Sequence, residues 1–269
     1  MPVPKKTFKK PPQKHQPRGL TIIYEDHDLI VVDKVAGLLS VGTEKVKDNT
    51  AYSHLLDYVK KGNPKSKAEV HIVHRLDRDT SGVLVFSKSR QAKGFLQDHW
   101  QDFSKTYYAV VHGSLFKKQG EIITILAENS AHKVYSINDP EQGKLSKTAY
   151  KVIKESKNFS LVEIDLITGR KNQIRAHMSE MGHPIAGDRV YGDKARAAKR
   201  LMLHAASMTL VHPHSKEKMT FEAKIPDYFK SLVSGKIKPL DHKKEEDTKA
   251  ATKSSISKSN KPKNTKKTS

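Results

Sequence analysis

The sequence predicts an α+β fold with a mixed, largely antiparallel sheet and flanking helices. Short apolar runs of strand-like composition follow one another in hairpin-like succession along the chain. A few segments with helical spacing of apolar residues are interspersed among them, which is typical of α+β domains. The chain has 269 residues and no internal repeat, so it can hold one large domain or two modest ones.

The chain begins with a segment that has little to bury. Residues 1–19 are rich in Lys, Pro and Gln, and we expect a disordered basic arm there. Two strands are expected next, at 20–25 and 29–32, because both runs are apolar and only a short polar turn separates them. A helix is expected at 51–61, where apolar residues recur with helical spacing before a Gly-Asn-Pro stop.

Residues 71–82 form the most distinctive stretch of the sequence. Two histidines, two arginines and two aspartates lie within these twelve residues, and apolar runs flank them. The pattern predicts a loop between two strands, and loops held by rigid strands are favoured places for chemistry. The alternative is a charged surface hairpin whose Arg and Asp side chains pair with each other.

The remaining elements follow from the same patterns. Ser89 can cap a helix that runs to about Asp102. The further elements expected are strands at 105–111, 120–126, 147–154 and 159–166, a helix around 174–181, strands near 207–212 and 218–223, and a helix at 227–233. The ordered domain should therefore span 20–237, and the Lys/Ser-rich residues 238–269 are expected to be a disordered tail.

The charge of the chain favours a polyanionic partner. The formal net charge is +21, and residues 1–19 and 238–269 contribute +6 each. The expected domain between them therefore carries +9 of its own. This excess favours nucleic acid as a partner, with a generally basic solubility surface as the alternative.

Composition also excludes several classes of protein. The chain has no cysteine, which rules out disulfides, thiolate nucleophiles and cysteine-based zinc sites, and which is typical of the cytoplasm. No secretory signal and no run of membrane-spanning length is present, so we expect a soluble protein. No glycine-rich nucleotide loop and no Gly-x-Ser-x-Gly elbow occurs either.

Three side chains are candidates for chemistry. Asp77 is a candidate carboxylate nucleophile or base, and Arg175, on a helix far along the chain, could keep it ionised. The alternative is a structural Asp–Arg bridge. Tyr107 could stack on a base or move a proton, although most strand tyrosines only pack. His71 and His74 suggest a metal, but on an expected strand their spacing puts them on opposite faces, so we expect no metal site.

Several segments together resemble a known family. These segments are His74-Arg75-Leu76-Asp77-Arg78-Asp79-Thr80-Ser81-Gly82, Lys105–Gly113, Thr168–Asp188 with Tyr191-Gly192, Arg200–Ala205 and the opening hairpin Glu25–Gly37. They resemble, in order, the motifs of the RluA-like family of RNA pseudouridine synthases over about 20–225. Two departures are Val35, where the family usually has proline, and Lys171-Asn172 in place of a Thr/Ser-His pair. Because only a short basic segment precedes the first strand, we expect the form of the family that lacks an N-terminal RNA-binding domain.

The resemblance implies a pseudouridine synthase fold with a central catalytic cleft. It implies isomerisation of uridines in ribosomal or transfer RNA, with Asp77, Tyr107 and Arg175 as catalytic residues. The substrate-binding residues expected are Arg75, Arg78 and Leu203. No cofactor, metal or membrane is implied, and a cytoplasmic monomer is expected. The alternatives are a noncatalytic RNA-binding or RNA-folding protein on the same fold, and a hydrolase that would release free uracil.

Overall fold

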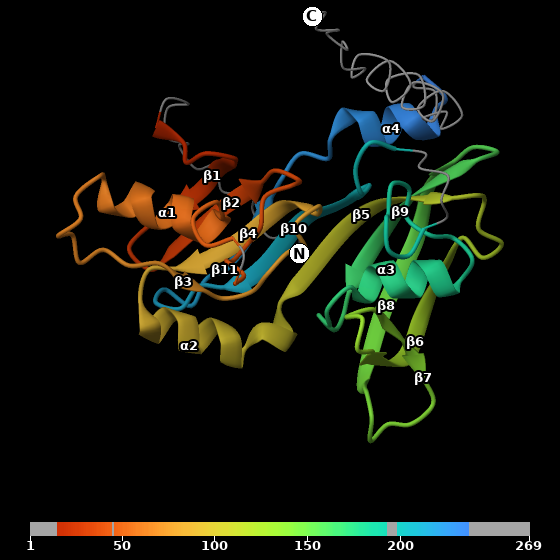
Figure 1. The fold of residues 1–269 in the computed structure, drawn as a ribbon, viewed down its shortest axis with the longest axis horizontal. Helices are drawn as coiled ribbons and strands as arrows, with labels where there is room; N and C mark the ends of the chain where they lie inside the picture. The colour runs from red at the N-terminus through yellow and green to blue at the C-terminus, as the bar shows by residue number, and fades with distance from the viewer. Residues whose placement is uncertain (1–14, 45, 193–197, 237–269) are drawn as a thin grey trace, which may run out of the picture.

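The computed structural model describes residues 15–44, 46–192 and 198–236, and they form an α+β fold around one sheet (Figure 1). The strands are β1 (Leu20–Glu25), β2 (Leu29–Lys34), β3 (His71–Ile72), β4 (Ser81–Ser87), β5 (Ser104–His112), β6 (Gln119–Glu128), β7 (Val134–Ile137), β8 (Lys144–Glu155), β9 (Phe159–Leu166), β10 (Leu203–Val211) and β11 (Lys218–Glu222). The helices are α1 (Ala51–Lys60), α2 (Arg90–Asp98), the 3-10 helix η2 (Trp100–Asp102), α3 (Gln173–Glu180) and α4 (Asp227–Val233).

The sheet is mixed and largely antiparallel, as the sequence predicts. Its main path runs β1-β2-β4-β10-β5-β9-β8-β6-β7, with β11 paired to β10 and β3 paired to β4. Only the contact between β4 and β10 is parallel among the pairs of the described strands. In Figure 1, β5 crosses the middle of the molecule and joins a half built on β1–β4 to a half built on β6–β9.

Strand β2 shows why the sheet needs a layer on each face. Its run of four apolar residues is buried throughout, and neighbouring side chains point to opposite faces. Ile30 and Val32 join one hydrophobic core, whereas Leu29 and Val31 join another. A continuous apolar run of this kind is typical of a strand covered on both sides.

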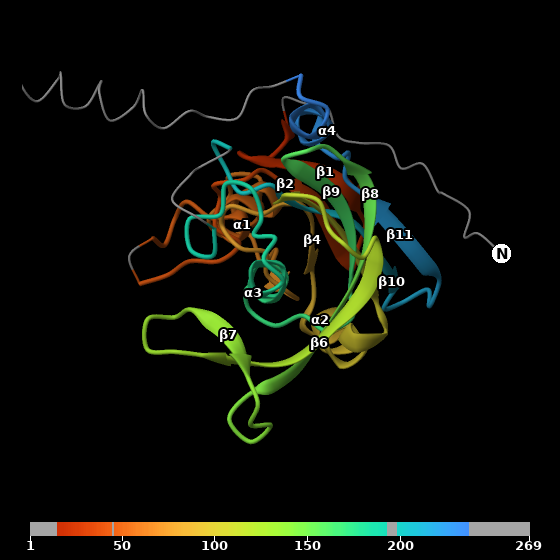
Figure 2. The ribbon, with the colours of Figure 1, turned by 90° about the vertical axis from the view of Figure 1, so that its right-hand side faces the viewer.

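The helices cover these two cores from different sides. Apolar residues of α1, α3 and α4 join the core of Ile30, and α2 contributes Leu96 to the core of Leu29. Hydroxyl caps begin two of them: Thr50 accepts from the backbone of Ser53, and Ser89 accepts from that of Ala92. Figure 2 shows α3 lying inside the curve of the sheet, next to the strands of the second half.

The structure differs from the sequence prediction at four places. The helix after Ser89 ends at Asp98, and the 3-10 turn η2 replaces its last part. Strand β10 begins at Leu203, before the strand expected near 207–212. A bulge between Ala205 and Ser207 interrupts the period-two alternation, so the sequence pattern does not reveal the first residues. Strand β7 lies in the polar region to which no element was assigned, and its four residues are too few for a clear alternation. Strand β3 covers only two residues, so His74 lies beyond it.

The described end of the expected N-terminal arm contacts the sheet. The backbone of Ile22 donates to the Gln16 side chain at 2.6 Å, and Pro17 is buried. Val35 donates its backbone N–H to the Gly19 carbonyl at 3.1 Å, a bond that the family's usual proline could not make. Residues 1–14 of the expected arm and the expected tail at 238–269 lie outside the described residues.

No helix in the described part of the chain is long and apolar enough to cross a membrane.

Candidate active site

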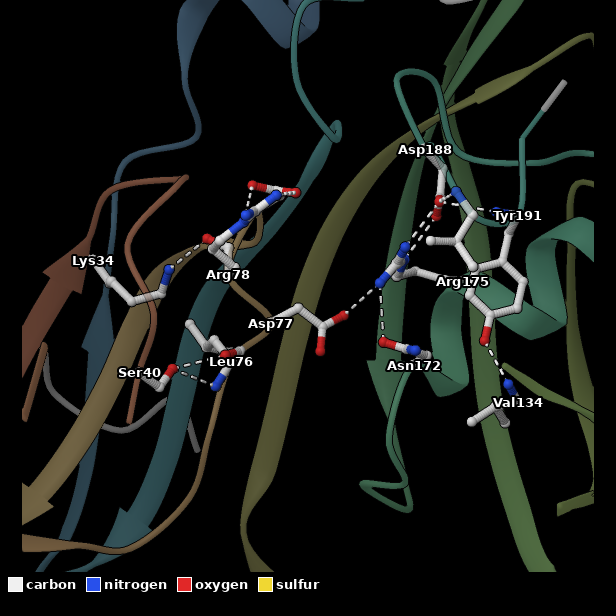
Figure 3. Close-up of polar contacts among 12 residues, drawn as sticks. Lys34, Ser40, Leu76, Asp77, Arg78, Val134, Asn172, Arg175, Asp188 and Tyr191 are labelled. Atoms are coloured by element: carbon white, nitrogen blue, oxygen red, sulfur yellow. Dashed lines mark hydrogen bonds and ion pairs between the residues drawn. The ribbon is translucent and has the colours of Figure 1, made fainter. Parts of the chain in front are cut away.

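Asp77 lies in the loop between β3 and β4, where hydrogen bonds fix the backbone of the residues before and after it (Figure 3). The Ser40 hydroxyl donates to the carbonyl of Leu76 at 2.7 Å and accepts from its N–H at 3.0 Å. On the other side, the carbonyl of Arg78 accepts from the Lys34 ammonium at 3.1 Å. The backbone on both sides of Asp77 is therefore fixed before any substrate binds, which suits a preorganised catalytic group.

Lys34 is the most unusual of these supports because its side chain is completely buried. Its ammonium donates to three carbonyl oxygens, those of Val35, Leu38 and Arg78, at 2.8–3.1 Å. Burial lowers the pKa of Lys34 to about 8, and the charges of Asp79 and Asp77 oppose that shift. Lys34 therefore remains largely a cation at neutral pH and ties the end of β2 to the loop that carries Asp77.

Lys34→Met should lower the free energy of unfolding by about 2 kcal/mol, because carbonyls that Lys34 now satisfies lose a buried donor. If Asp77 acts in catalysis, activity should fall roughly 10-fold, since small displacements of a reacting group are costly. Urea unfolding and an activity assay measure the two effects. Lys47→Met, at an exposed position, is the control and should leave stability unchanged. Equal stability of the Lys34 and Lys47 variants would contradict this role.

Gly82 lets the loop run into the centre of the sheet. Its φ angle is +114°, and a Cβ at this position would lie 2.0 Å from the Ala205 carbonyl oxygen. Only glycine allows β4 and β10 to approach this closely. The close pairing brings the start of β10, including Leu203, beside the loop of Asp77.

Arg175 reaches Asp77 from the other half of the molecule. It lies on α3, and its Nη1 donates to Asp77 Oδ2 at 3.1 Å and to Asn172 Oδ1 at 2.9 Å. Asn172 has a left-handed backbone with φ of 51°, which asparagine tolerates better than most residues. The departure from the family's usual pair at 171–172 therefore still provides a partner for Arg175.

Asp188 holds the opposite edge of the same guanidinium. Arg175 Nε and Nη2 donate to its two carboxylate oxygens at 2.7 and 2.9 Å, a bidentate pair. The Asp188 side chain is 0% exposed and also accepts from the backbone N–H groups of Val190 and Tyr191. Burial alone would raise the pKa of Asp188, but Arg175 and these N–H groups hold it below its usual value.

The sequence did not single out Asp188 as a site residue. It stands within a segment that resembles the family, but no pattern there indicates that it meets Arg175. Its position directly after Gly187 is the available signal, because glycine often marks a turn or a close backbone approach, and loops disproportionately carry functional side chains. The φ of Gly187 is +77°, and a Cβ there would lie 2.0 Å from the Arg200 carbonyl oxygen.

The predicted site residues line two adjoining cavities. A cavity of about 510 Å³ is lined by Arg75, Asp77, Tyr107, Arg175 and Leu203 among others. A smaller one of about 280 Å³ shares Arg75, Asp77 and Arg175 and adds Arg78. All six expected residues therefore border the same cleft, and Arg78 is the one that lines only the smaller part. Its exposed guanidinium pairs with Asp79.

Tyr107 is 7% exposed and lines the larger cavity from the middle of β5. Burial, followed by the negative charge of Asp77, raises the pKa of its hydroxyl well above the usual range. The side chain therefore stays protonated at neutral pH. Within the described residues, no group forms a hydrogen bond to this hydroxyl.

The two histidines of the loop have partners other than a metal. His74 Nε2 accepts from the Val85 backbone N–H at 3.0 Å, and burial lowers the pKa of His74 to about 3. His71 Nε2 lies 3.2 Å from a Glu69 carboxylate oxygen, although the two do not meet hydrogen-bond geometry. His74 thus supports β4 as a neutral ring, and its strand placement in the sequence prediction was wrong. No three His, Asp or Glu side chains gather as a metal site in the described ranges.

Known proteins resemble this chain in sequence over most of its length. Residues 28–180 match the family model described as RNA pseudouridylate synthase. Ribosomal large subunit pseudouridine synthase C of Rickettsia bellii is 38% identical over 215 residues, which cover 77% of this chain and 69% of that protein. Dual-specificity RNA pseudouridine synthase RluA of Vibrio cholerae is 35% identical over 201 residues, covering 73% of this chain and 79% of that protein.

A solved structure shows the same fold. The human protein RNA pseudouridylate synthase domain containing 4 superposes with a TM-score of 0.66 at 24% identity, over 79% of this chain and 91% of that one. The fold is therefore that of a pseudouridine synthase domain. The chain belongs to the RluA-like family of RNA pseudouridine synthases, which are isomerases.

Proposed function

We propose that Asp77 is the carboxylate that initiates the isomerisation, and that the target uridine lies in ribosomal or transfer RNA. The observation that carries the proposal is the Asp77–Arg175 pair at 3.1 Å, set in a cleft lined by Tyr107 and Leu203. We further propose a cytoplasmic monomer that needs no cofactor, metal or membrane.

The reaction exchanges the N1–C1′ bond of uridine for a C5–C1′ bond, so no net oxidation or group transfer occurs. Breaking the glycosidic bond builds positive charge at C1′, which a nearby carboxylate can trap or stabilise. Alternatively, Asp77 removes the C2′ proton and a glycal forms. Both routes need an ionised Asp77, and Arg175 stabilises that charge while Asp188 and Asn172 hold the guanidinium in place.

Tyr107 and Leu203 would enclose the uracil base while it rotates to bring C5 to C1′. Leu203 offers an apolar wall, and the Tyr107 ring offers a stacking surface. After the new bond forms, C5 must lose a proton and N1 must gain one. The raised pKa of Tyr107 disfavours a phenolate, so its hydroxyl would assist by hydrogen bonding rather than as a preformed base.

Tyr107→Phe is therefore expected to lower kcat roughly 100-fold, the scale of general acid–base assistance, with KM nearly unchanged. The ring that contacts the base remains, so RNA binding should persist. Tyr108→Phe is a matched control on the same strand: Tyr108 points to the opposite face and donates to Glu163. Lost RNA binding in the Tyr107 variant would contradict the proposed role.

Arg75 and Arg78 are proposed to contact the RNA backbone at the mouth of the cleft. Both are exposed, and Arg75 borders both cavities beside Asp77. A uridine in folded RNA must leave its stack to reach a recessed pocket, and cations near its phosphates would stabilise the extruded state.

The RNA class is proposed from the relatives, whose names include a ribosomal large subunit enzyme and a dual-specificity enzyme. To test the function, unmodified ribosomal and transfer RNA transcripts would be incubated with the protein, and pseudouridine would be mapped at nucleotide resolution. New pseudouridine at defined positions is expected. Free uracil as the product would instead identify a hydrolase, and binding without product would identify a noncatalytic protein.

A further inference from the structure

The larger cavity continues past the position proposed for the target base. Asp77, Tyr107, Arg175 and Leu203 border one part of it. The remaining lining comes from residues without a role in the chemistry, including Ile72, Gln97, Trp100, Lys105, Gly169 and Arg170. The cavity volume of about 510 Å³ is in the range of pockets that hold a whole drug-sized ligand. A single pyrimidine ring would fill only part of it.

The second part of the cavity adjoins the first along β5. Lys105 and Tyr107 are two residues apart on this strand, so both side chains point to the same face, about 7 Å apart. The Lys105 ammonium donates to the Trp100 carbonyl at 3.0 Å and lies 5.3 Å from the centre of the indole ring. Trp100 belongs to η2, directly before β5. Tyr107, Lys105 and Trp100 therefore follow one another along the floor of the cleft.

Trp100 is held in place by the core of Leu29 on one side, where its ring meets Phe103 edge-on, and by His74 on another. Its ring packs on the His74 imidazole, with centroids 4.6 Å apart and planes inclined by 32°. The opposite wall comes close at Gly169, where a Cβ would lie 3.7 Å from Trp100 Nε1. No group in the described ranges accepts a hydrogen bond from Nε1. The cleft thus narrows between an indole on one side and the segment that begins at Gly169 on the other.

The charge at this end of the cleft suits a phosphate backbone. Arg170 is exposed, and among the described residues its guanidinium makes no ion pair. Lys171 beside it is paired with Glu128. Asp77 is the single carboxylate among the residues that line the larger cavity. Cations interleaved with an aromatic ring and few acids are typical of grooves that bind single-stranded nucleic acid.

We propose that this part of the cleft, formed by Trp100, Lys105 and Arg170, binds the nucleotide next to the target uridine in the RNA. The Trp100 indole contacts the base of that nucleotide, and Arg170 lies near its phosphate. The proposal rests on the proposed function, because it takes the target base to lie between Asp77 and Tyr107. Contact with an aromatic face is tolerant of sequence, so this site strengthens binding without selecting the neighbouring base.

The chain contains one tryptophan, so its fluorescence reports on this site alone. Wild-type protein would be titrated with a nine-nucleotide oligouridylate and, separately, with an abasic oligonucleotide of the same length. We expect the oligouridylate to quench the emission at saturation and the abasic strand to leave it largely unchanged. Equal responses to both probes would overturn a base contact at Trp100.

Activity on an unmodified ribosomal RNA transcript provides the second measurement. Trp100→Ala is expected to raise KM about 10-fold with kcat within about 3-fold, the scale of one lost base contact, and Trp100→Phe should recover most of the affinity. Phe116→Ala removes an aromatic side chain that is 96% exposed and lines neither cavity, so it should change neither constant. An unchanged KM in Trp100→Ala, or a loss confined to kcat, would overturn the proposal.

The two assays separate this proposal from the proposed function. Pseudouridine formation by the wild type without base-dependent quenching would retain the function and overturn the Trp100 site. Base-dependent quenching without pseudouridine would retain the site and overturn the function. If Trp100→Ala does not fold, the wild-type titration with the two probes still decides.

Discussion

Replacing Asp77 by asparagine is expected to abolish pseudouridine formation, with a loss of more than about 10⁴-fold in kcat, as for other essential catalytic side chains. The amide has nearly the same shape as the carboxylate but can neither trap the developing charge at C1′ nor remove a proton. Asp77 is 32% exposed, and its side chain pairs with Arg175. The substitution should therefore leave the fold intact, which circular dichroism and thermal unfolding would check.

RNA affinity separates this effect from a loss of binding. Asp77→Asn removes a negative charge from a basic cleft, so RNA should bind equally well or more tightly. Asp57→Asn is the matched control, because Asp57 is an exposed carboxylate on α1, and it should keep full activity. Substantial turnover by the Asp77 variant, measured as pseudouridine per enzyme over time, would rule out Asp77 as the essential carboxylate.

Asp188→Asn is expected to produce the second-largest change, with lower stability and lower activity together. Asparagine can keep the backbone bonds from Val190 and Tyr191 through Oδ1, but its NH₂ group would face Arg175 Nε, donor against donor. Breaking a buried charge pair from one side costs about 3 kcal/mol of folding stability. Because Arg175 then loses the partner that sets its orientation, kcat should also fall, by roughly 10- to 100-fold.

The pH dependence of stability tests this account. The pKa of Asp188 is lower in the folded chain than its ordinary value, so its contribution is fully present above about pH 4 and is lost as the pH falls further. The Asp188 variant should therefore differ most from wild type at neutral pH and approach it in acid. Asp227→Asn, in an exposed pair with Lys224, is the control and should match wild type throughout. A constant difference across the pH range would exclude the ionised carboxylate as the cause.

Much of the fold follows from local pattern. The strands β1, β2, β5 and β9 have enough apolar residues in succession or alternation to be recognised, and hydroxyl caps mark the starts of α1 and α2. Strand β7 is too short for such a pattern, and the bulge in β10 shifts its alternation partway along the strand. Secondary-structure propensity and hydrophobic periodicity depend only on residues close in sequence. They therefore cannot predict a strand that is defined mainly by the strand it pairs with.

The candidate site was likewise predictable from the sequence only in part. The sequence alone determined that the chain carries a loop rich in arginine and aspartate, a strand tyrosine and a distant arginine in an order that resembles one family. Only the tertiary structure decided which charges meet. Asp77 and Arg175 are 98 residues apart, and the fold brings them to 3.1 Å while Asp188 takes the other edge of the guanidinium. The physical reason is that ion pairs and buried hydrogen bonds depend on distance in space, which pairing of β4 with β10 and packing of α3 on the sheet establish.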